Sequence, residues 1–144
     1  MADERESVRV LSDDECWALL VEKDFGRLAV SIGDQPEIFP INYTTVEGGI
    51  LVRTAEGTKL FGVTVNNRVA FEIDDFGATD GWSVVLKGRA RALESEAEIA
   101  EAEQASLVPW IPTVKRNFIR IAVEEISGRR VTFGPEPEAD LDAS

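Results

Sequence analysis

The feature that most constrains the fold is an alternating run of residues that leads into two glycines and a second apolar run. Residues 38–45 alternate in the way expected of a strand whose side chains point to opposite faces of a sheet. Gly48 and Gly49 can supply the positive φ angles of a tight turn, and the mainly apolar residues 50–53 are expected to form the second strand of the pair. The sequence therefore predicts a β-hairpin over residues 38–53.

The end of this hairpin carries groups that suit a phosphate. Arg53 and Thr54 end the second strand, and Thr58 and Lys59 come just before a short helical pattern that starts at Leu60. Guanidinium, ammonium and hydroxyl groups, together with the free N–H groups of a helix N-terminus, all bind phosphate oxygens. In the alternative interpretation these side chains are merely solvated, and Thr58 is only a helix cap.

Other segments predict more short strands and a few helices. A helix starts after Ser12, which forms a capping box with Glu15, and Gly26 is expected to end it. A second capping box at Ser95 opens a helix that runs to about Leu107, and the pattern from Leu60 predicts a short helix to residue 67. Strands are expected at residues 28–32, 69–74, 82–92, 117–123 and 125–133.

Six or seven short antiparallel strands with flanking helices predict a mainly β, α+β fold in the form of a small barrel. The chain has no G-x-G-x-x-G pattern of a Rossmann dinucleotide fold. One domain is expected over residues 10–133, between a flexible N-terminus (residues 1–9) and a disordered acidic tail (residues 134–144).

The charge balance narrows the class of partner. The chain carries 27 acidic and 15 basic residues, a net charge of −12, which repels nucleic acids and anionic membranes, so neither is expected as a partner. We find no signal-peptide pattern, no apolar run long enough for a membrane span, and a single cysteine, Cys16. These features predict a cytoplasmic protein.

The lack of histidine restricts the possible chemistry. It excludes Ser-His-Asp and Cys-His catalysis and His-ligated zinc or haem, so no catalytic side chain and no metal site are predicted. Chemistry would then depend on carboxylates, Lys, Tyr or a bound organic cofactor. Cys16 could be a nucleophile, but its place on the apolar face of a helix favours core packing.

Two charged stretches have both a functional and a structural interpretation. Glu72, Asp74 and Asp75 could bind a metal, although a solvated strand face accounts for them more simply. The residues Lys87, Arg89 and Arg91 form a basic stripe on one face of a predicted strand. This stripe could bind an acidic ligand, or it could pair with neighbouring Glu and Asp side chains.

Taken in order, several short motifs resemble those of the pyridoxamine 5′-phosphate oxidase-like family. They are GRLAVS (residues 26–31), FPINY (39–43), VRTAEGTKL (52–60), GWSVVLKGRA (81–90) and ISGRRV (126–131). The resemblance covers roughly residues 10–133. It implies a split β-barrel that forms a homodimer with two flavin mononucleotide (FMN) sites at the subunit interface.

The resemblance also implies roles for particular residues. Arg53, Thr54 and Lys59 would hold the FMN phosphate with help from Thr58, and Trp110 would lie on the substrate side. Trp82 and Ser83 would come from the partner subunit. The residues that would line the isoalloxazine edge are Pro40, Ile41, Asn42 and Tyr43, with Val52 beneath the ring.

Two departures from the family pattern limit the activity that is expected. True vitamin B6 oxidases bind their substrate through further basic and histidine residues, which this chain lacks, so it is not expected to oxidise pyridoxamine phosphate. Some nitroimidazole reductase relatives depend on a histidine near the position of Asn42. The leading hypothesis is an FMN-dependent oxidoreductase acting on a small molecule. The alternatives are a deazaflavin (coenzyme 420)-dependent reductase, favoured only by the basic stripe, and a flavin-binding protein without turnover.

Overall fold

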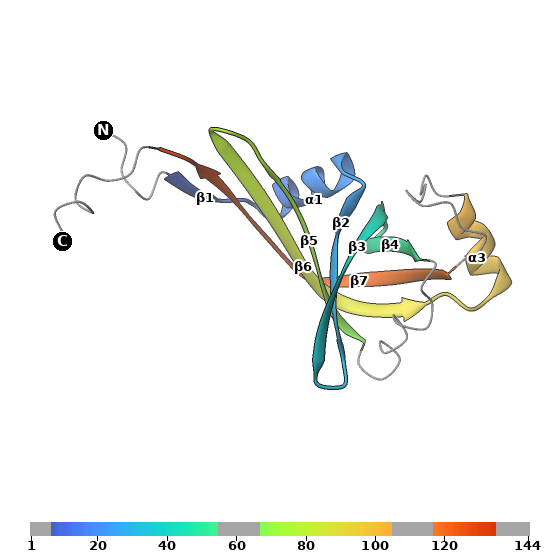
Figure 1. Ribbon diagram of the computed structural model, residues 1–144. Coiled ribbons are helices and arrows are strands. Elements are labelled where there is room, and N and C mark those ends of the chain that lie inside the picture. Colours follow the sequence, from blue (N-terminus) through green and yellow to red (C-terminus); the bar gives the residue numbers. More distant parts are fainter. Residues whose placement is uncertain (1–6, 55–66, 105–116, 135–144) are drawn as a thin grey trace.

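The protein is a split β-barrel with two helices on its surface, as seen in a computed structural model that describes residues 7–54, 67–104 and 117–134 (Figure 1). All strand pairs are antiparallel, in the order β1-β7-β4-β3-β2-β5-β6, and β6 also pairs with β7, which closes the ring. The strands are β1 (Val8–Val10), β2 (Phe25–Ile32), β3 (Gln35–Val46), β4 (Gly49–Thr54), β5 (Arg68–Phe76), β6 (Asp80–Ala92) and β7 (Asn117–Thr132). The α+β barrel predicted from the strand pattern is confirmed.

The hairpin from which the fold was predicted is β3 and β4. Tyr43 pairs with Val52, Val46 pairs with Gly49, and Gly48 adopts a φ of 72° in the turn between the strands. That angle lies in the left-handed region, which glycine enters without the steric penalty of a Cβ. The predicted positive φ is therefore confirmed at Gly48, whereas Gly49 is the first residue of β4 and does not have a positive φ.

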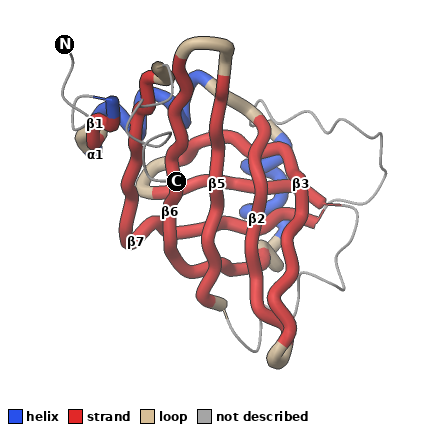
Figure 2. Tube along the Cα trace, turned by 60° about the vertical axis from the view of Figure 1, so that its left-hand side comes forward, coloured by secondary structure: helices blue, strands red, loops and turns tan. Residues whose placement is uncertain are grey.

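The barrel interior is filled by the alternate apolar residues of strands β2 to β7. Leu28 on β2, Val69, Phe71 and Ile73 on β5, and Ile121 on β7 are all buried in one cluster. The inward positions of β5 are those that its alternation predicted. Figure 2 looks onto the wall in which β6, β5, β2 and β3 lie side by side.

The C-terminal strand pair differs from the sequence prediction. Residues 117–123 and 125–133 were expected to form two strands, but β7 runs without interruption from Asn117 to Thr132. The register of the β6–β7 pair shifts at Lys87/Gly88, because Lys87 pairs with Glu125 while Gly88 pairs with Val123. At this point β7 has one residue more than β6. The extra residue forms a bulge, which bends a strand without ending it.

The first helix, α1 (Asp13–Glu22), packs against β7, β3 and β6. Its predicted capping box is present, with the Ser12 hydroxyl accepting from the Glu15 amide and the Glu15 carboxylate accepting from the Ser12 amide. The free thiol of Cys16 is fully buried, as expected of a core residue, and burial is the main cause that raises its pKa. A buried, protonated thiol is a poor nucleophile.

The prediction that Gly26 ends this helix was wrong. The helix ends at Glu22, and Gly26 lies within β2 opposite Ile41. A Cβ at this position would come within 2.5 Å of the Phe71 ring and 2.6 Å of the Glu72 carbonyl oxygen. The glycine is therefore explained by the close approach of β5 rather than by a helix terminus.

The second described helix, α3 (Glu96–Glu103), lies on the outside of the barrel near the ends of β4 and β7 (Figure 1). The Ser95 hydroxyl caps it by accepting from the Glu98 amide at 3.1 Å, as the sequence predicted. Ala102 packs with Leu51 and Phe118 in a small apolar cluster separate from the interior core. This cluster attaches α3 to the outer surface of the sheet.

One strand was not predicted at all. β1 has only three residues, all exposed, and it pairs with β7 through Val8–Val131 and Val10–Arg129. Three exposed residues carry no alternation of burial that a sequence pattern could reveal. In the described part of the chain, no helix is long and apolar enough to span a membrane.

Candidate functional site

Arg53 stands on the outer face of β4, one residue before the strand ends. Its neighbour Val52 points into the core, and the alternation of a strand therefore directs Arg53 outward. The guanidinium carbon lies 5.5 Å from the centre of the Phe118 ring, its register partner on β7. An aromatic face at this distance attracts a cation and holds the side chain against the sheet.

The Nε–H group of Arg53 is buried without a hydrogen-bond partner among the described residues. A buried donor without an acceptor carries a free-energy penalty of about 1–3 kcal/mol, so such groups are uncommon in stable structures. An anion bound beside the guanidinium would remove that penalty. Arg53 is therefore the described side chain most clearly suited to a ligand.

The other predicted phosphate ligands are only partly placed. Thr54 is the last residue of β4 and pairs with Asn117, which puts its backbone next to Arg53. Thr58 and Lys59 lie outside the described residues, as do the predicted short helix that starts at Leu60 and the predicted substrate-side residue Trp110.

The residues predicted to line a ring edge lie on β3, beside Arg53. The Tyr43–Val52 pair puts Asn42 next to Arg53, one step further along both strands. Asn42 is 8% exposed and donates its side-chain N–H to the Asp24 carbonyl oxygen at 3.2 Å. Pro40 is exposed, whereas the side chains of Ile41 and Val52 belong to the core.

Tyr43 is a structural residue of the barrel interior. Its hydroxyl donates to the Leu20 carbonyl oxygen at 2.7 Å, and its ring meets Phe71 edge-on at 5.0 Å between centroids. Burial is the main cause that raises the pKa of Tyr43, with a smaller effect from Asp24. Since Ile41, Tyr43 and Val52 all point inward, they can present only their backbone groups to a ligand on the outer face.

Trp82 and Ser83 are far from Arg53 within one chain. Trp82 pairs with Arg130, whereas the opposite end of β6 reaches β7 at Ile119, next to Phe118. Ten residues separate Trp82 from Ala92 on β6, which corresponds to about 33 Å of strand. A single chain does not bring Trp82 and Arg53 together, and the Trp82 side chain is itself only 7% exposed and part of the interior core. A common site would therefore need a second copy, to which Trp82 offers little more than its edge and backbone.

A cavity of about 300 Å³ lies between α3 and the outer face of β4 and β7. Leu51, on the same face of β4 as Arg53, forms part of the cavity wall. Phe118 lies between the cavity and Arg53, because its ring contacts the Arg53 guanidinium and also packs with Leu51 and Ala102. The lining residues are Val46, Leu51, Arg91, Leu93, Glu98, Glu101, Ala102 and Arg120.

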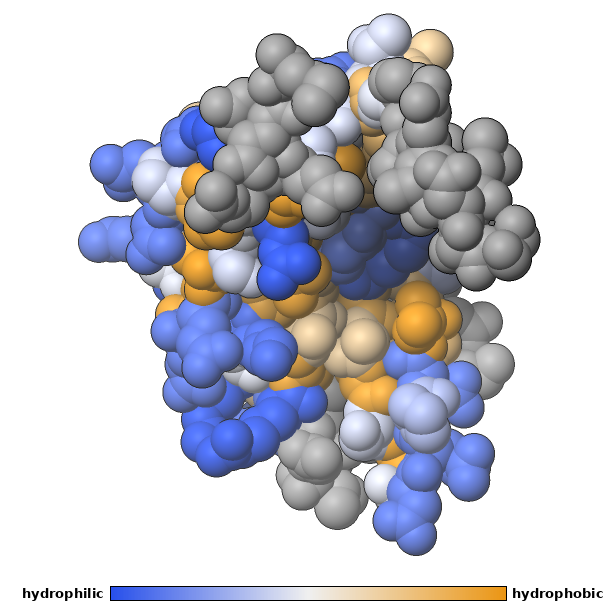
Figure 3. All heavy atoms as spheres, turned by 90° about the vertical axis from the view of Figure 1, so that its left-hand side faces the viewer, coloured by the Kyte–Doolittle hydropathy of each residue, from blue (hydrophilic) through white to orange (hydrophobic). Residues whose placement is uncertain are grey.

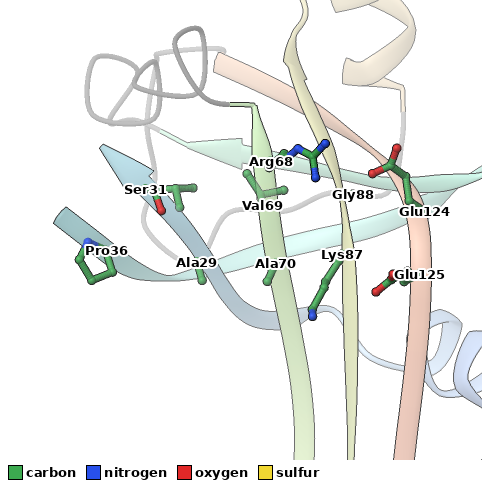
Figure 4. A pocket seen from close by; sticks show the side chains of 11 residues that line it. Ala29, Ser31, Pro36, Arg68, Val69, Ala70, Lys87, Gly88, Glu124 and Glu125 are labelled. Atoms are coloured by element: carbon green, nitrogen blue, oxygen red, sulfur yellow. The ribbon is translucent and has the colours of Figure 1, made fainter. Parts of the chain in front are cut away.

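Larger hollows lie on the other side of the barrel, over β2, β5, β6 and β7. Figure 4 shows one of about 510 Å³, in which Ala29 and Ala70 leave open space between Lys87 and Glu125 on one side and Pro36 on the other. Residues of five strands form a single row across this face by register, namely Ile38, Ala29, Ala70, Lys87 and Glu125. We call this surface the row face.

The row face combines apolar and charged side chains. Ile38 is 67% exposed, and with Ala29, Ala70 and Val85 it lines a shallow pocket. Figure 3, a view of this side of the molecule, shows apolar atoms in the middle of the face with hydrophilic side chains on both sides. An exposed apolar area with a polar rim is typical of a surface that contacts another molecule.

The acidic stretch on β5 forms ion pairs. Arg27 donates to Glu72 at 2.8 Å and to Asp74 at 3.0 Å, and Lys23 contacts Asp75 at 3.1 Å. Burial, followed by a hydrogen bond with Asp74, raises the pKa of Glu72 to about 7, while Arg27 acts in the opposite direction. The interpretation of this stretch as a charged strand face accounts for all three carboxylates.

The basic stripe on β6 is also largely paired. Arg89 contacts Glu124 at 3.2 Å, and Arg91 contacts Glu98 at 2.8 Å. Lys87 is the register partner of Glu125 and Ala70. The prediction that these cations pair with neighbouring acids is therefore confirmed for the two arginines, and little of the stripe's charge is left for an acidic ligand.

Sequence reasoning missed two parts of this region. Phe118 was predicted to lie in a strand, but its position under Arg53 depends on the β4–β7 register, for which the sequence gives no local signal. The cavity beside α3 was also not foreseen, because it requires Leu51 and Arg120 on the sheet to face Glu101 and Ala102 on a helix some fifty residues away from Leu51 in the chain.

Comparisons with known proteins agree with this fold. The family model for pyridoxamine 5′-phosphate oxidase matches residues 12–130. An uncharacterized protein of Mycobacterium tuberculosis is 49% identical over 89 residues, which cover 62% of this chain and 81% of that protein.

Solved structures show the same similarity. The FAD binding protein from Mycobacterium smegmatis is 43% identical with a TM-score of 0.73, covering 88% of this chain and 100% of that one. A candidate pyridoxamine 5′-phosphate oxidase from Corynebacterium glutamicum is 40% identical with a TM-score of 0.80, covering 88% of this chain and 99% of that one. With the family model spanning most of the chain, this protein belongs to the pyridoxamine 5′-phosphate oxidase-like family of split β-barrels.

Proposed function

We propose that this protein is a flavin-dependent oxidoreductase that binds the FMN group through its phosphate at Arg53. The observation that carries the proposal is the buried Nε–H of Arg53, which lacks a partner among the described residues. A phosphate oxygen accepts from such a donor in a charge-assisted hydrogen bond, and a guanidinium can present two N–H groups to it in parallel. The residues present at the end of β4 therefore fit the group.

Similarity to a flavoprotein supports the cofactor class. The M. smegmatis relative that shares 43% identity is named as an FAD binding protein, and FMN forms half of FAD. Thr54, Thr58 and Lys59 would complete the phosphate site, with Asn42 and the backbone of Pro40, Ile41 and Tyr43 next to the ring. The deazaflavin alternative loses its one sequence argument, since Arg89 and Arg91 are engaged by Glu124 and Glu98.

The bound flavin would supply hydride or electron transfer, and the chain would supply position. Arg53 would fix the phosphate end, while the β3 backbone at residues 40–43 would fix the ring end. No acid or base from a side chain is needed for this role, which agrees with a chain that contains no histidine. The same lack of histidine speaks against pyridoxamine phosphate as the substrate.

The proposal includes a homodimer in which the partner provides Trp82 and Ser83. Within one chain these residues are about 33 Å of strand away from the Arg53 end of the sheet. The row face is also suited to self-association, because Ile38 and the two alanines are apolar and the rim carries both signs of charge. It lies on the other side of the barrel from Arg53, so contact through this face alone would not bring the partner's Trp82 to Arg53. A twofold axis could bring Lys87 of one copy near acidic residues of the other.

The first experiment is an absorption spectrum of the freshly purified protein, followed by calorimetric titrations with FMN, FAD and coenzyme 420. Flavin bands, or micromolar binding of FMN or FAD, would support the proposal, and reduction by a nicotinamide donor followed by reoxidation would establish turnover. A preference for coenzyme 420 would support the deazaflavin alternative. Flavin binding without reduction by any donor would favour a binding protein, and no binding would contradict the phosphate site.

A further inference from the structure

One end of the barrel carries most of the large apolar side chains that the described residues leave exposed. Four of the six lie there, namely Val8 and Val10 on β1, Phe76 at the end of β5, and Phe133 just after β7. Val8 pairs with Val131, and directly paired residues point to the same face of a sheet, so β1 adds its valines to the face that carries Phe133. An exposed apolar area of this kind is typical of a surface that contacts another molecule.

Phe76 and Phe133 form a flat aromatic surface at this end. Their rings stack with 6.3 Å between centroids and 24° between planes. Phe76 is the register partner of Gly81, where a Cβ would collide with the Phe76 ring, so the ring lies directly over the glycine. The Phe133 amide donates to the Thr79 carbonyl oxygen at 2.8 Å. The sheet therefore holds both rings in place, yet the two residues remain 54% and 46% exposed.

We propose that the Phe76–Phe133 pair covers the flavin ring of a second copy, so that Arg53 of one chain and this pair of the other hold the same flavin. The inference rests on the proposed function and deepens it, because it names the side chains that the partner supplies. Trp82 was expected in this position, but it is 7% exposed and belongs to the core. The exposed pair next to it on the hairpin can present aromatic faces to a planar ring, which Trp82 cannot.

The flavin ring needs such a cover on β3 and β4. Of the residues predicted to line it, Ile41, Tyr43 and Val52 point into the core and offer it only backbone groups. Backbone groups can hydrogen-bond to the edge of the ring, but they do not cover its faces. An aromatic pair from outside the chain supplies the apolar contact that these inward side chains do not give.

The position of the pair favours contact with a second copy over contact within one chain. In Figure 1 the tip of the β5–β6 hairpin, where Phe76 lies, and α3, beside the end of β4, are at opposite ends of the molecule. Phe76 is on the same outer face of β5 as Ala70 of the row face, six residues or about 20 Å further along the strand. An interface that extends from the row face along β5 would include the pair and add the reach that the row face alone lacks. A twofold axis would repeat this contact in both copies.

The charges of the two ends are complementary. Arg129 is the register partner of both Ser83 and Val10, so it lies on the same face as the aromatic pair. The end that carries Arg53 is bordered by α3, whose eight residues include four glutamates and no basic residue. A cationic end therefore meets an acidic end when the pair of one copy approaches Arg53 of the other.

The test removes the aromatic faces and keeps the apolar contact. Phe76→Leu combined with Phe133→Leu gives this double variant, and Val21→Leu is the control, because Val21 is 68% exposed on α1, away from this end. Circular dichroism melts would verify folding, and sedimentation equilibrium would verify that the proteins are dimers. In calorimetric titrations we expect the double variant to bind FMN about tenfold more weakly than wild type, and the control to stay within about twofold.

Mixed dimers show whether the pair acts on the other chain. Arg53→Ala lacks the phosphate contact and keeps the pair, whereas the double variant lacks the pair and keeps Arg53. Refolded together from urea, the two should form dimers in which one site is complete, so wild-type affinity should return for one FMN per mixed dimer.

Three results would overturn the inference and leave the Arg53 site intact. They are wild-type affinity in the double variant, mixed dimers that bind FMN no more tightly than their parents, and a wild-type protein that binds FMN as a monomer. Failure of wild type to bind FMN would instead contradict the proposed function itself.

Discussion

At the scale of single residues, Arg53 and Tyr43 show how neighbouring positions in one hairpin can have different roles. The Tyr43 hydroxyl is fully engaged by the Leu20 carbonyl, and the side chain is closed off from solvent. Arg53, next to the register partner of Tyr43, faces outward with a buried donor that finds no acceptor in the described chain. The first arrangement stabilises the fold, and the second is suited to a ligand.

Replacing Arg53 should therefore affect binding more than folding. Arg53→Ala removes a charge-assisted contact to phosphate, and we expect flavin affinity to fall several-fold or more. Arg9→Ala is the control, since Arg9 forms an exposed ion pair with Glu15 at 3.0 Å on the opposite part of the chain. Calorimetry at matched ionic strength measures both variants. Unchanged affinity in Arg53→Ala would exclude the phosphate role of Arg53.

Glu72 makes stability depend on pH in a direction that can be stated. Its pKa is raised in the folded protein to about 7 from an ordinary value of 4.5, chiefly by burial. The folded state thus binds a proton more tightly than the unfolded state, so this contribution to stability is complete below pH 4.5 and is lost as the pH rises to about 7.

Glu72→Gln removes this titration, so its stability relative to wild type should increase between pH 4.5 and pH 7 and then level off. Urea denaturation of both proteins across this range measures the difference. A constant difference at every pH would show that the pKa of Glu72 is not raised. Asp13→Asn, on the exposed first turn of α1, is a control that leaves Glu72 and its partners Asp74 and Arg27 unchanged.

At the scale of elements, the β6–β7 pair depends on residues that have no side chain. Gly88 lies at the register shift, and a Cβ there would collide with the carbonyl oxygen of Ala122. The obstacle is backbone, which cannot rotate away as a side chain would. Gly49 meets the carbonyl of Ile121 in the same way from β4, so β7 is approached closely from both sides.

Gly88→Ala should therefore lower the free energy of unfolding by about 3 kcal/mol, at the upper end of what overpacking costs. Gly77→Ala is the matched control: its Cβ would meet nothing closer than 3.6 Å, and its φ is not positive. We expect the control to change stability by less than about 1 kcal/mol. Urea denaturation of the two variants measures this difference, and a similar cost for both would mean that the approach of β7 is looser than described.

At the scale of the whole molecule, the row face is where we propose that a second copy binds. It places the exposed Ile38 and two alanines in line with Lys87 and Glu125 across five strands. Such a face can pair with itself about a twofold axis, which is the commonest symmetry of soluble oligomers. A dimer formed here would also cover the apolar pocket that a single chain leaves open.

If the proposed dimer forms through this face, Ile38→Asp should weaken it by about a hundredfold or more, because the twofold axis would bury two unpaired carboxylates. Val21→Asp is the control, since Val21 on α1 is 68% exposed, nearly the same as Ile38, but lies outside the row face. Sedimentation equilibrium over a range of concentrations measures the association. Dimers of equal strength in both variants would place the interface elsewhere.

Much of this architecture could be predicted from the sequence because it depends on local patterns. The alternation of residues 69–74, the turn at Gly48 and the cap at Ser12 each act over a few neighbours. The length of β7, the purpose of Gly26 and the position of Phe118 under Arg53 depend on which strands meet and in what register. These features are set by contacts between distant segments, and one sequence gives no local signal for them.

The position of β7 in the ring has a consequence for how the chain is made. It pairs with β1, β4 and β6, and it is the last strand described along the chain. While the chain is being synthesised, β4 lacks its β7 partner until residues 117–122 have been made, and β6 lacks it until residues 119–132 have been made. Exposed strand edges of this kind are open to pairing with other chains. Barrel closure must therefore follow the synthesis of nearly the whole domain, and until then the β7-facing edges of β4 and β6 can pair with other chains.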